Sequence, residues 1–188
     1  MKKLFFLMIL FASNFVFAQK GNLYTNFPET FESPDTTAKS HYKKADVDLK
    51  SGNWIFDQSL LGAIGDRDRV NGKQSVRFQQ NRDKSSFLEM NFDLLNGASK
   101  VQVAYGSYYK DPSCKWRLES STDGGKTWKQ EGKDIEDANN KLQVAIFNLD
   151  LKGRVRFRIN KLGLGSSKDD PSIKNGRLNI DDFAVYQN

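Results

Sequence analysis

The sequence predicts an all-β fold, an antiparallel β-sandwich of the jelly-roll type. Apolar residues recur at every second position from Trp54 onward, which is the period of a strand with one buried face. Asn-Gly turn signals at 71–72, 96–97 and 175–176 separate these runs. Apart from the first residues, no stretch of ten or more keeps an apolar stripe at helical spacing. Many short antiparallel strands in one chain of this length are typical of a sandwich or barrel.

The chain opens with a predicted secretory signal peptide at residues 1–18. Two lysines precede an apolar run to about Leu10, and small residues stand at the −3 and −1 positions before Gln19. The run is too short to serve as a membrane anchor, and no later segment resembles a transmembrane span. We therefore expect export to the periplasm or the extracellular space. Residues 19–188 have the length of a single domain.

The expected strands follow one another along this domain, nine or ten in number. The first is expected around 27–32 and another around Trp54. The other alternating runs lie at 75–79, 88–94, 101–105, 116–118, 144–146, 154–159 and 177–186. The polar segment 163–176 is expected to be a long surface loop. Residues 66–72 are expected to form a solvated loop; the alternative is a calcium-binding loop, which is disfavoured because the glycine stands one residue late and no glutamate closes the loop.

Charge and cysteine content limit the possible partners. Loss of Lys2 and Lys3 with the signal peptide lowers the formal net charge from +6 to +4, a mild excess that favours an anionic surface or polymer. No motif specific for nucleic acid is present. Cys114 is the only cysteine, so it forms no internal disulfide, and its shared parity with Trp116 and Leu118 predicts that it is buried.

The stretch Ser121–Trp128 reads STDGGKTW and fits the S-x-D-x-G-x-T-W pattern called an Asp-box. Its Asp123 is expected to accept hydrogen bonds from its own turn, and the two glycines after it can take positive φ. The alternative, a catalytic or metal-binding role for Asp123, is disfavoured because the turn uses the carboxylate.

No catalytic constellation is apparent, so we do not expect an enzyme. His41 is the only histidine and lies in a polar stretch, which leaves no partner for a nucleophilic triad. Glu89 and Glu119 stand alone on their strands, whereas glycoside hydrolysis needs two carboxylates that flank a cleft. Phosphate-binding loops and zinc-ligand spacings are also lacking.

Three carboxylates form a candidate structural calcium site. Ile180 and Phe183 have opposite strand parity, so a bulge at Asp181 and Asp182 would bury both apolar residues and turn a carboxylate to the sheet edge. If the first and last strands are neighbours, Glu32 joins these acids. The alternative is that all three are hydrogen-bonded edge residues.

A row of arginines forms the candidate ligand surface. Alternate residues of one strand face the same side, and planar guanidinium groups suit carboxylates, sulfates or phosphates on a polymer. The aromatic ring among them would supply a stacking face, and a merely solvated sheet face is the alternative. The candidate residues are Arg77, Tyr108, Arg117, Arg154, Arg156 and Arg158.

Several segments together resemble a jelly-roll accessory domain of secreted Bacteroidetes proteins: ETFES, SGNW, NGKQSVRF, LEMNFDL, the Asp-box, GRVRFRI and RLNIDDFAVY. That domain is similar to carbohydrate-binding modules, to galactose-binding-like jelly rolls and to MAM-type domains. The resemblance implies structural calcium held by an early glutamate and a late aspartate, at the positions of Glu32 and of Asp181 or Asp182. It also implies a secreted, non-catalytic module that binds a glycan or another extracellular polymer. The alternatives are an adhesive cell-envelope protein that binds another protein, and a polysaccharide-active enzyme.

Overall fold

The computed structural model describes residues 21–188, so the predicted signal peptide lies outside the described part. The strands are β1 (Ala45–Leu49), β2 (Gly52–Phe56), β3 (Ser59–Gly62), β4 (Ser75–Phe78), β5 (Ser86–Met90), β6 (Ala98–Ser107), β7 (Trp116–Ser121), β8 (Lys129–Ile135), β9 (Gln143–Leu151), β10 (Arg156–Lys161) and β11 (Leu178–Tyr186). The short 3-10 helix η1 (Thr36–Lys39) is the one helical element of the described residues. The all-β prediction is confirmed.

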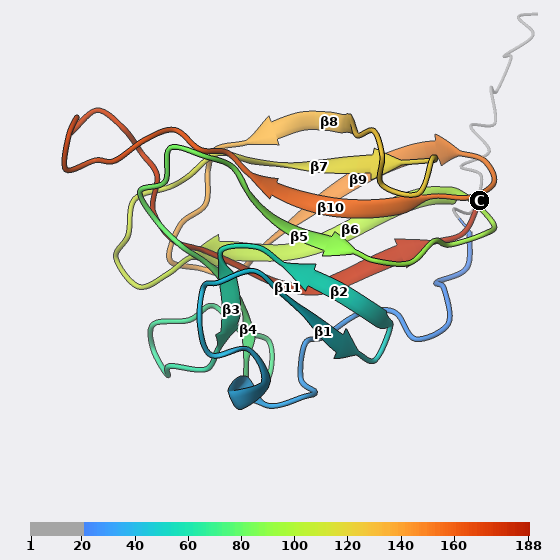
Figure 1. Cartoon of the computed structure of the whole chain (residues 1–188), viewed down its shortest axis with the longest axis horizontal. Helices are drawn as coiled ribbons and strands as arrows, with labels where there is room; N and C mark the ends of the chain where they lie inside the picture. Colours follow the sequence, from blue (N-terminus) through green and yellow to red (C-terminus); the bar gives the residue numbers. More distant parts are fainter. Residues whose placement is uncertain (1–20) are drawn as a thin grey trace, which may run out of the picture.

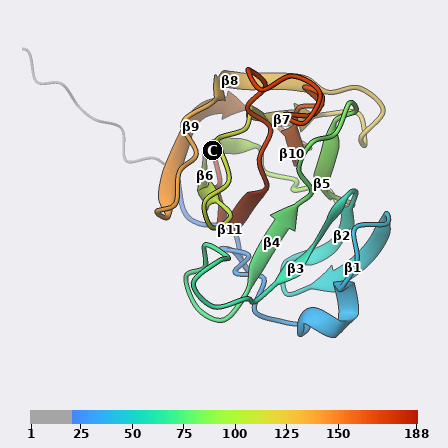
Figure 2. The ribbon, with the colours of Figure 1, turned by 90° about the vertical axis from the view of Figure 1, so that its left-hand side faces the viewer.

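Two antiparallel sheets pack face to face (Figure 1). One has six strands in the order β1-β2-β5-β10-β7-β8, and the other has five in the order β3-β4-β11-β6-β9. Figure 2 shows these two layers from one end of the molecule. Neighbours in each sheet are mostly distant in the sequence, which is the mark of a jelly-roll sandwich and not of a simple meander.

The core lies between the sheets and follows the period-two pattern. Leu88 and Met90 of β5 are fully buried, as are Phe157 and Ile159 of β10. Burial of each such side chain stabilises the fold by about 1.5–3 kcal/mol. Cys114 is 2% exposed and free, which confirms the predicted inward orientation.

Two fully buried tryptophans organise the aromatic part of the core. Trp54 meets Phe31 and Phe183 edge-on, with ring centroids 6.0 and 5.3 Å apart. Trp116 meets Tyr105 in the same way at 5.1 Å. Edge-to-face pairs at these distances add about 0.5–1.5 kcal/mol beyond the burial of area. The two clusters join both sheets into one core.

The segment expected to form the first strand, 27–32, is not a strand. It makes one isolated bridge, between Glu29 and Phe183 of β11. Pro28 has no N–H to give to a ladder, and Phe31 has a positive φ of 57°, so continuous pairing is interrupted. The first and last segments are nevertheless neighbours, as expected.

The last strand contains the predicted bulge. Its pairing with β6 shifts register between Asp181 and Ala184, and Asp182 has a φ of 43°. Ile180 and Phe183 are both fully buried as a result. Asp181 is also buried and points away from the core, because it alternates with Ile180.

The turn at Ser121–Trp128 uses its aspartate locally, as expected. Asp123 accepts hydrogen bonds from the Thr127 hydroxyl at 2.6 Å and from the backbone N–H groups of Lys126 and Thr127 at 3.0 Å each. These hydrogen bonds hold the pKa of Asp123 far below its usual range, and the bond from the Thr127 hydroxyl has the largest effect. Trp128 folds back, and its Nε1 donates to the carbonyl of Gly125 at 3.0 Å.

Loops gather at one end of the sandwich. The segment 163–176 projects there as a long loop, at the left of Figure 1, as the sequence predicts. The loop between β3 and β4 lies at the same end. No helix among residues 21–188 has the length and apolar character needed to cross a membrane.

Candidate functional site

The outer face of the six-stranded sheet carries paired charges across three strands. On β10, Arg158 Nε lies 2.6 Å from Glu119 Oε2 of β7, and its Nη1 lies 3.7 Å from Glu89 Oε2 of β5. Arg156 Nε lies 2.6 Å from Asp93 Oδ1. The guanidinium groups already have carboxylate partners, so this part of the face is close to electrically neutral.

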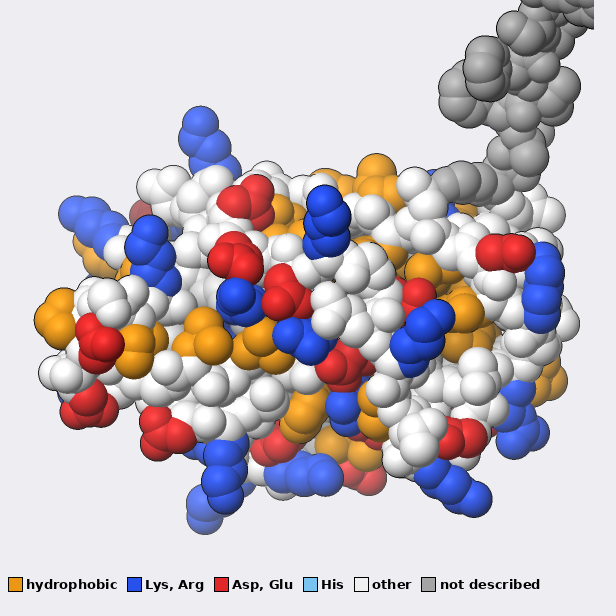
Figure 3. Space-filling model, turned by 90° about the horizontal axis from the view of Figure 1, so that it is seen from above, with side chains coloured by type: hydrophobic (Ala, Val, Ile, Leu, Met, Phe, Trp, Pro, Cys, Tyr) orange, Lys and Arg blue, Asp and Glu red, His pale blue; other side chains and the backbone are white. Residues whose placement is uncertain are grey.

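The other two predicted arginines on this side are also paired. Arg117 Nε lies 2.9 Å from Asp134 Oδ1. Arg154 precedes β10 and shares Asp93 at 3.3 Å, but its side chain is 62% exposed. An anionic polymer would have to displace carboxylates from most of these arginines. The alternation of acidic and basic side chains, with apolar ones between them, is also visible on the side of the molecule shown in Figure 3.

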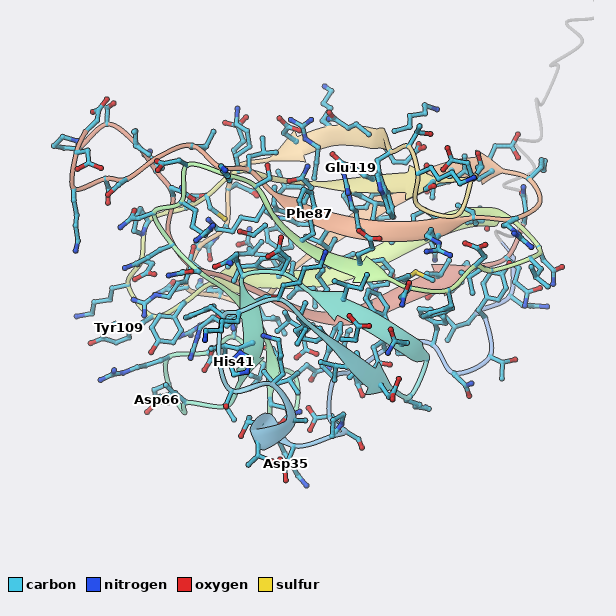
Figure 4. The ribbon with its side chains drawn as sticks, viewed as in Figure 1. Asp35, His41, Asp66, Phe87, Tyr109 and Glu119 are labelled. Atoms are coloured by element: carbon cyan, nitrogen blue, oxygen red, sulfur yellow. The ribbon has the colours of Figure 1, made fainter. Side chains whose placement is uncertain are left out.

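Two aromatic rings frame the centre of this face. The guanidinium carbon of Arg158 lies 4.1 Å from the ring centroid of Phe87 and 4.2 Å from that of Trp128. Both aromatic side chains are partly exposed, and Figure 4 shows Phe87 and Glu119 over the same sheet. We name Phe87, Trp128 and Arg158, with Glu89 and Glu119, the platform.

The sequence identified Arg158 but missed both rings of the platform. Phe87 has the outward parity of Glu89 on β5, and that parity is the signal that could have found it. Trp128 could not be placed, because its position depends on how the β7–β8 turn folds over β10. Burial raises the pKa of Glu89, and the charges of Arg158 and Arg156 oppose that increase.

Arg77 and Tyr108 do not belong with the arginine row, and this corrects the expected single surface. Arg77 lies on β4 of the five-stranded sheet, on the opposite side of the molecule from β10. Tyr108 is only 4% exposed, since its ring lies between Arg77 and Arg177, whose guanidinium carbons are 4.8 and 4.0 Å from its centroid. It therefore offers no open stacking face, whereas the next residue, Tyr109, is exposed.

Residues 63–74, the β3–β4 loop, fold back onto the five-stranded sheet, where Asp68 contacts Asn179 of β11. Asp68 is buried and accepts from Arg77 Nη1 at 2.7 Å, from the Ile64 N–H at 2.9 Å and from Asn179 Nδ2 at 2.9 Å. Arg69 Nη1 donates to the carbonyl of Asn140 at 2.9 Å. The prediction that this loop is simply solvated is wrong for Asp68, because the loop returns to the sheet.

The three predicted metal ligands come together around the end of the same loop. The Asn71 N–H donates to Asp181 Oδ2 at 2.7 Å, and Asn71 Nδ2 donates to Asp182 Oδ2 at 2.7 Å. Glu32 Oε1 accepts from the Lys73 N–H at 2.9 Å. Burial raises the pKa of Asp181 to about 7, and the charges of Asp182 and Glu32 add to the effect.

The three carboxylates do not form a complete coordination shell for a metal ion. Within residues 21–188 no three His, Cys, Asp or Glu side chains stand in an arrangement that would hold a metal ion by themselves. None of the three acids has an ion-pair partner in that part of the chain. A cation here would need backbone carbonyls or water to complete its shell.

A cavity of about 360 Å³ lies beneath the long loop, where Leu164 and Ile173 face Cys114. Burial raises the pKa of the Cys114 thiol to about 11, so the thiol is not a nucleophile at neutral pH. His41 is exposed, follows η1 closely in the chain, and does not line this cavity. These groups do not form a nucleophile and base pair.

No family model and no curated protein sequence matches this chain. Among solved structures, it is similar to the K2 cleaved adhesin domain of Lys-gingipain, with 14% identity, a TM-score of 0.58, and coverage of 85% of this chain and 97% of that one. It is also similar to the CBM22-1 xylan-binding domain of Paenibacillus barcinonensis Xyn10C, with 11% identity, a TM-score of 0.51, and coverage of 90% and 97%. At these identities the likeness concerns the fold: this chain has the β-sandwich fold of carbohydrate-binding modules.

Proposed function

We propose that this protein is a secreted, non-catalytic module that binds a glycan on the platform of the six-stranded sheet. The observation that carries the proposal is the guanidinium of Arg158 held between the rings of Phe87 and Trp128, with carboxylates beside it. Secretion is supported by the sequence pattern of residues 1–18. The fold shared with a xylan-binding domain is consistent with this role.

The chemistry of the platform suits a neutral sugar. A pyranose offers an apolar C–H face, which packs on an aromatic ring, and a rim of hydroxyl groups, which need both donors and acceptors. Glu89 accepts and Arg158 donates, and the buried Glu119 holds Arg158 Nε at 2.6 Å and Asn160 Nδ2 at 2.8 Å. Ion pairs fix these groups in place, so little side-chain entropy is lost on binding.

The proposal is tested by comparing the binding of neutral oligosaccharides by the wild-type protein and by the Phe87→Ala variant. The wild-type protein should bind at least one neutral polysaccharide on a glycan array or in affinity electrophoresis. Phe87→Ala should weaken that binding about tenfold or more, since one stacked ring is removed. Leu95→Ala is the matched control, because Leu95 is 67% exposed and lies outside the platform. Equal binding by the wild type and Phe87→Ala would refute the assignment of the platform.

We also propose that Glu32, Asp181 and Asp182 hold a structural calcium ion. Carboxylate and carbonyl oxygens are the ligands that calcium prefers, and a buried carboxylate beside two others is destabilised without a cation. Calcium should raise the melting temperature of the wild type and a chelator should lower it, whereas Asp181→Asn should respond to neither. An unchanged melting temperature of the wild type after chelation would exclude this site.

A second function, adhesion to a cell-envelope protein, is favoured by one observation. The edge strand β9 exposes Val144 and Ile146 by 55% and 58%, and edge strands of this kind can pair with another chain. The likeness to an adhesin domain is again one of fold. Co-purification of one fixed protein, lost in Val144→Lys and retained in Phe87→Ala, would support this function over glycan binding.

A further inference from the structure

A second surface lies at the loop end of the five-stranded sheet, away from the platform. Tyr109 is 43% exposed there. The guanidinium carbon of Arg67 and the Nζ of Lys110 each lie 5.4 Å from the centroid of its ring. Figure 4 shows Tyr109 and Asp66, the neighbour of Arg67, at the same end of the molecule. Two cationic side chains thus lie near one exposed aromatic ring.

These two cations differ from the other basic groups nearby. Arg77 and Arg177, which lie on either side of Tyr108, are paired with Asp68 at 2.7 Å and with Asp111 at 2.7 Å. Arg67 and Lys110 have no ion-pair partner and no side-chain hydrogen bond within residues 21–188. Their positive charge is therefore available to a ligand.

The backbone holds Tyr109 in a strained and fixed position. Its φ of 48° is in the left-handed region, which a bulky residue adopts only when its surroundings impose it. The Tyr109 N–H donates to the carbonyl of Arg67 at 2.8 Å, which joins the two loops. Tyr108, directly before it, is clamped in place. The exposed ring is thus presented to solvent by a rigid base.

We propose that Tyr109, Arg67 and Lys110 form a binding site for an acidic sugar residue, a pyranose that carries a carboxylate or sulfate group. The sugar ring would pack on Tyr109, and its acidic group would meet the two cations. This site lies outside the platform and does not depend on it. Asp66, an exposed acid in the same loop, would oppose the binding of an anion, whereas Asp68 and Asp111 are paired with Arg77 and Arg177.

The size of the site favours a sugar over a longer polyanion. One ring and two free cations match a single acidic residue. Nucleic acid requires a row of phosphate contacts, but the neighbouring Arg69, Arg77 and Arg177 are engaged with backbone carbonyls or carboxylates. A stacking face beside the charge also gives selectivity for a ring-shaped anion over inorganic sulfate.

Calorimetric titration with an oligogalacturonate, which carries only carboxylates, and with a keratan sulfate oligosaccharide, which carries only sulfates, tests this site. At least one of them should bind, and Arg67→Gln, Lys110→Gln and Tyr109→Ala should each weaken that binding roughly tenfold. Asp66→Asn should strengthen it severalfold. The two probes distinguish a carboxylate from a sulfate as the recognised group.

Two controls make the result decisive. Lys168→Gln removes the same charge from an exposed position on the long loop and should leave the affinity unchanged. Phe87→Ala should also leave it unchanged, even if the platform proposal fails. The inference is overturned if neither probe binds, if Lys168→Gln weakens binding as much as Lys110→Gln, or if single-stranded DNA of equal charge binds as well as the acidic sugars.

Discussion

Replacement of Asp68 by asparagine is expected to lower the free energy of unfolding by about 3 kcal/mol. Asp68 is buried, and both of its oxygens contact Arg77 Nη1, at 3.0 and 2.7 Å. The side chain of Arg77 is itself only 12% exposed. Removal of one partner of a buried pair costs about 3–5 kcal/mol, because the other charge stays buried without compensation. Asparagine keeps one acceptor oxygen, so we expect the lower end of this range.

Thermal unfolding followed by circular dichroism measures this effect. For a domain of this length, about 3 kcal/mol corresponds to a decrease in melting temperature on the order of 10 °C. Asp66→Asn is the matched control, since it makes the same chemical change at an exposed position of the same loop. It should change stability by less than about 0.5 kcal/mol.

A double-mutant cycle with Arg77→Met separates the pair from the other contacts of Asp68. Asp68 also accepts from the Ile64 N–H and from Asn179 Nδ2, each at 2.9 Å. A coupling free energy above about 1 kcal/mol is expected between Asp68 and Arg77. The reasoning is refuted if Asp68→Asn and Asp66→Asn have equal melting temperatures, or if the coupling is close to zero.

Three further predictions concern single groups. Cys114, 2% exposed with a pKa of about 11, should react with a thiol reagent at pH 8 only after unfolding; rapid labelling of the native protein would contradict this. Asp123→Ala should speed amide hydrogen exchange at Lys126 and Thr127, which lose their acceptor; unchanged exchange at both amides would contradict this. The pKa of Asp181 is raised to about 7 in the folded state. In the presence of a chelator, the stability that Asp181 contributes should therefore be present below about pH 4 and lost as pH rises through about 7. If the free energy of unfolding of Asp181→Asn depends on pH with the same slope as that of the wild type, this prediction is contradicted.

Strand parity predicted burial well because it is a local property. The buried positions of β5 and β10 follow from their two-residue alternation, and the bulge of β11 follows from the clash of parity between Ile180 and Phe183. The gathering of Glu32 with Asp181 and Asp182 was also predicted, since it needs only that the first and last segments be neighbours. Whether these acids bind calcium stays a prediction.

Membership of a sheet could not be predicted, because strand pairing is set by contacts between distant segments. Arg77 and Arg156 share outward parity, yet β4 and β10 belong to different sheets. Parity also says nothing about a loop that returns to cover a face. Tyr108, directly after β6, has outward parity and is still buried, since the guanidinium groups of Arg77 and Arg177 lie over its ring.

The β3–β4 loop links the two sites proposed on its side of the molecule. Three residues of this loop make the contacts. The Arg67 carbonyl accepts from the Tyr109 N–H, Asp68 forms an ion pair with Arg77, and the Asn71 N–H donates to Asp181. These three fixed points lie within five residues, so a change that frees one of them loosens the other two. A cation at Asp181 would favour the ordered loop, and an acidic sugar at Arg67 requires that order. Because binding free energies are reciprocal, each ligand should then tighten the binding of the other.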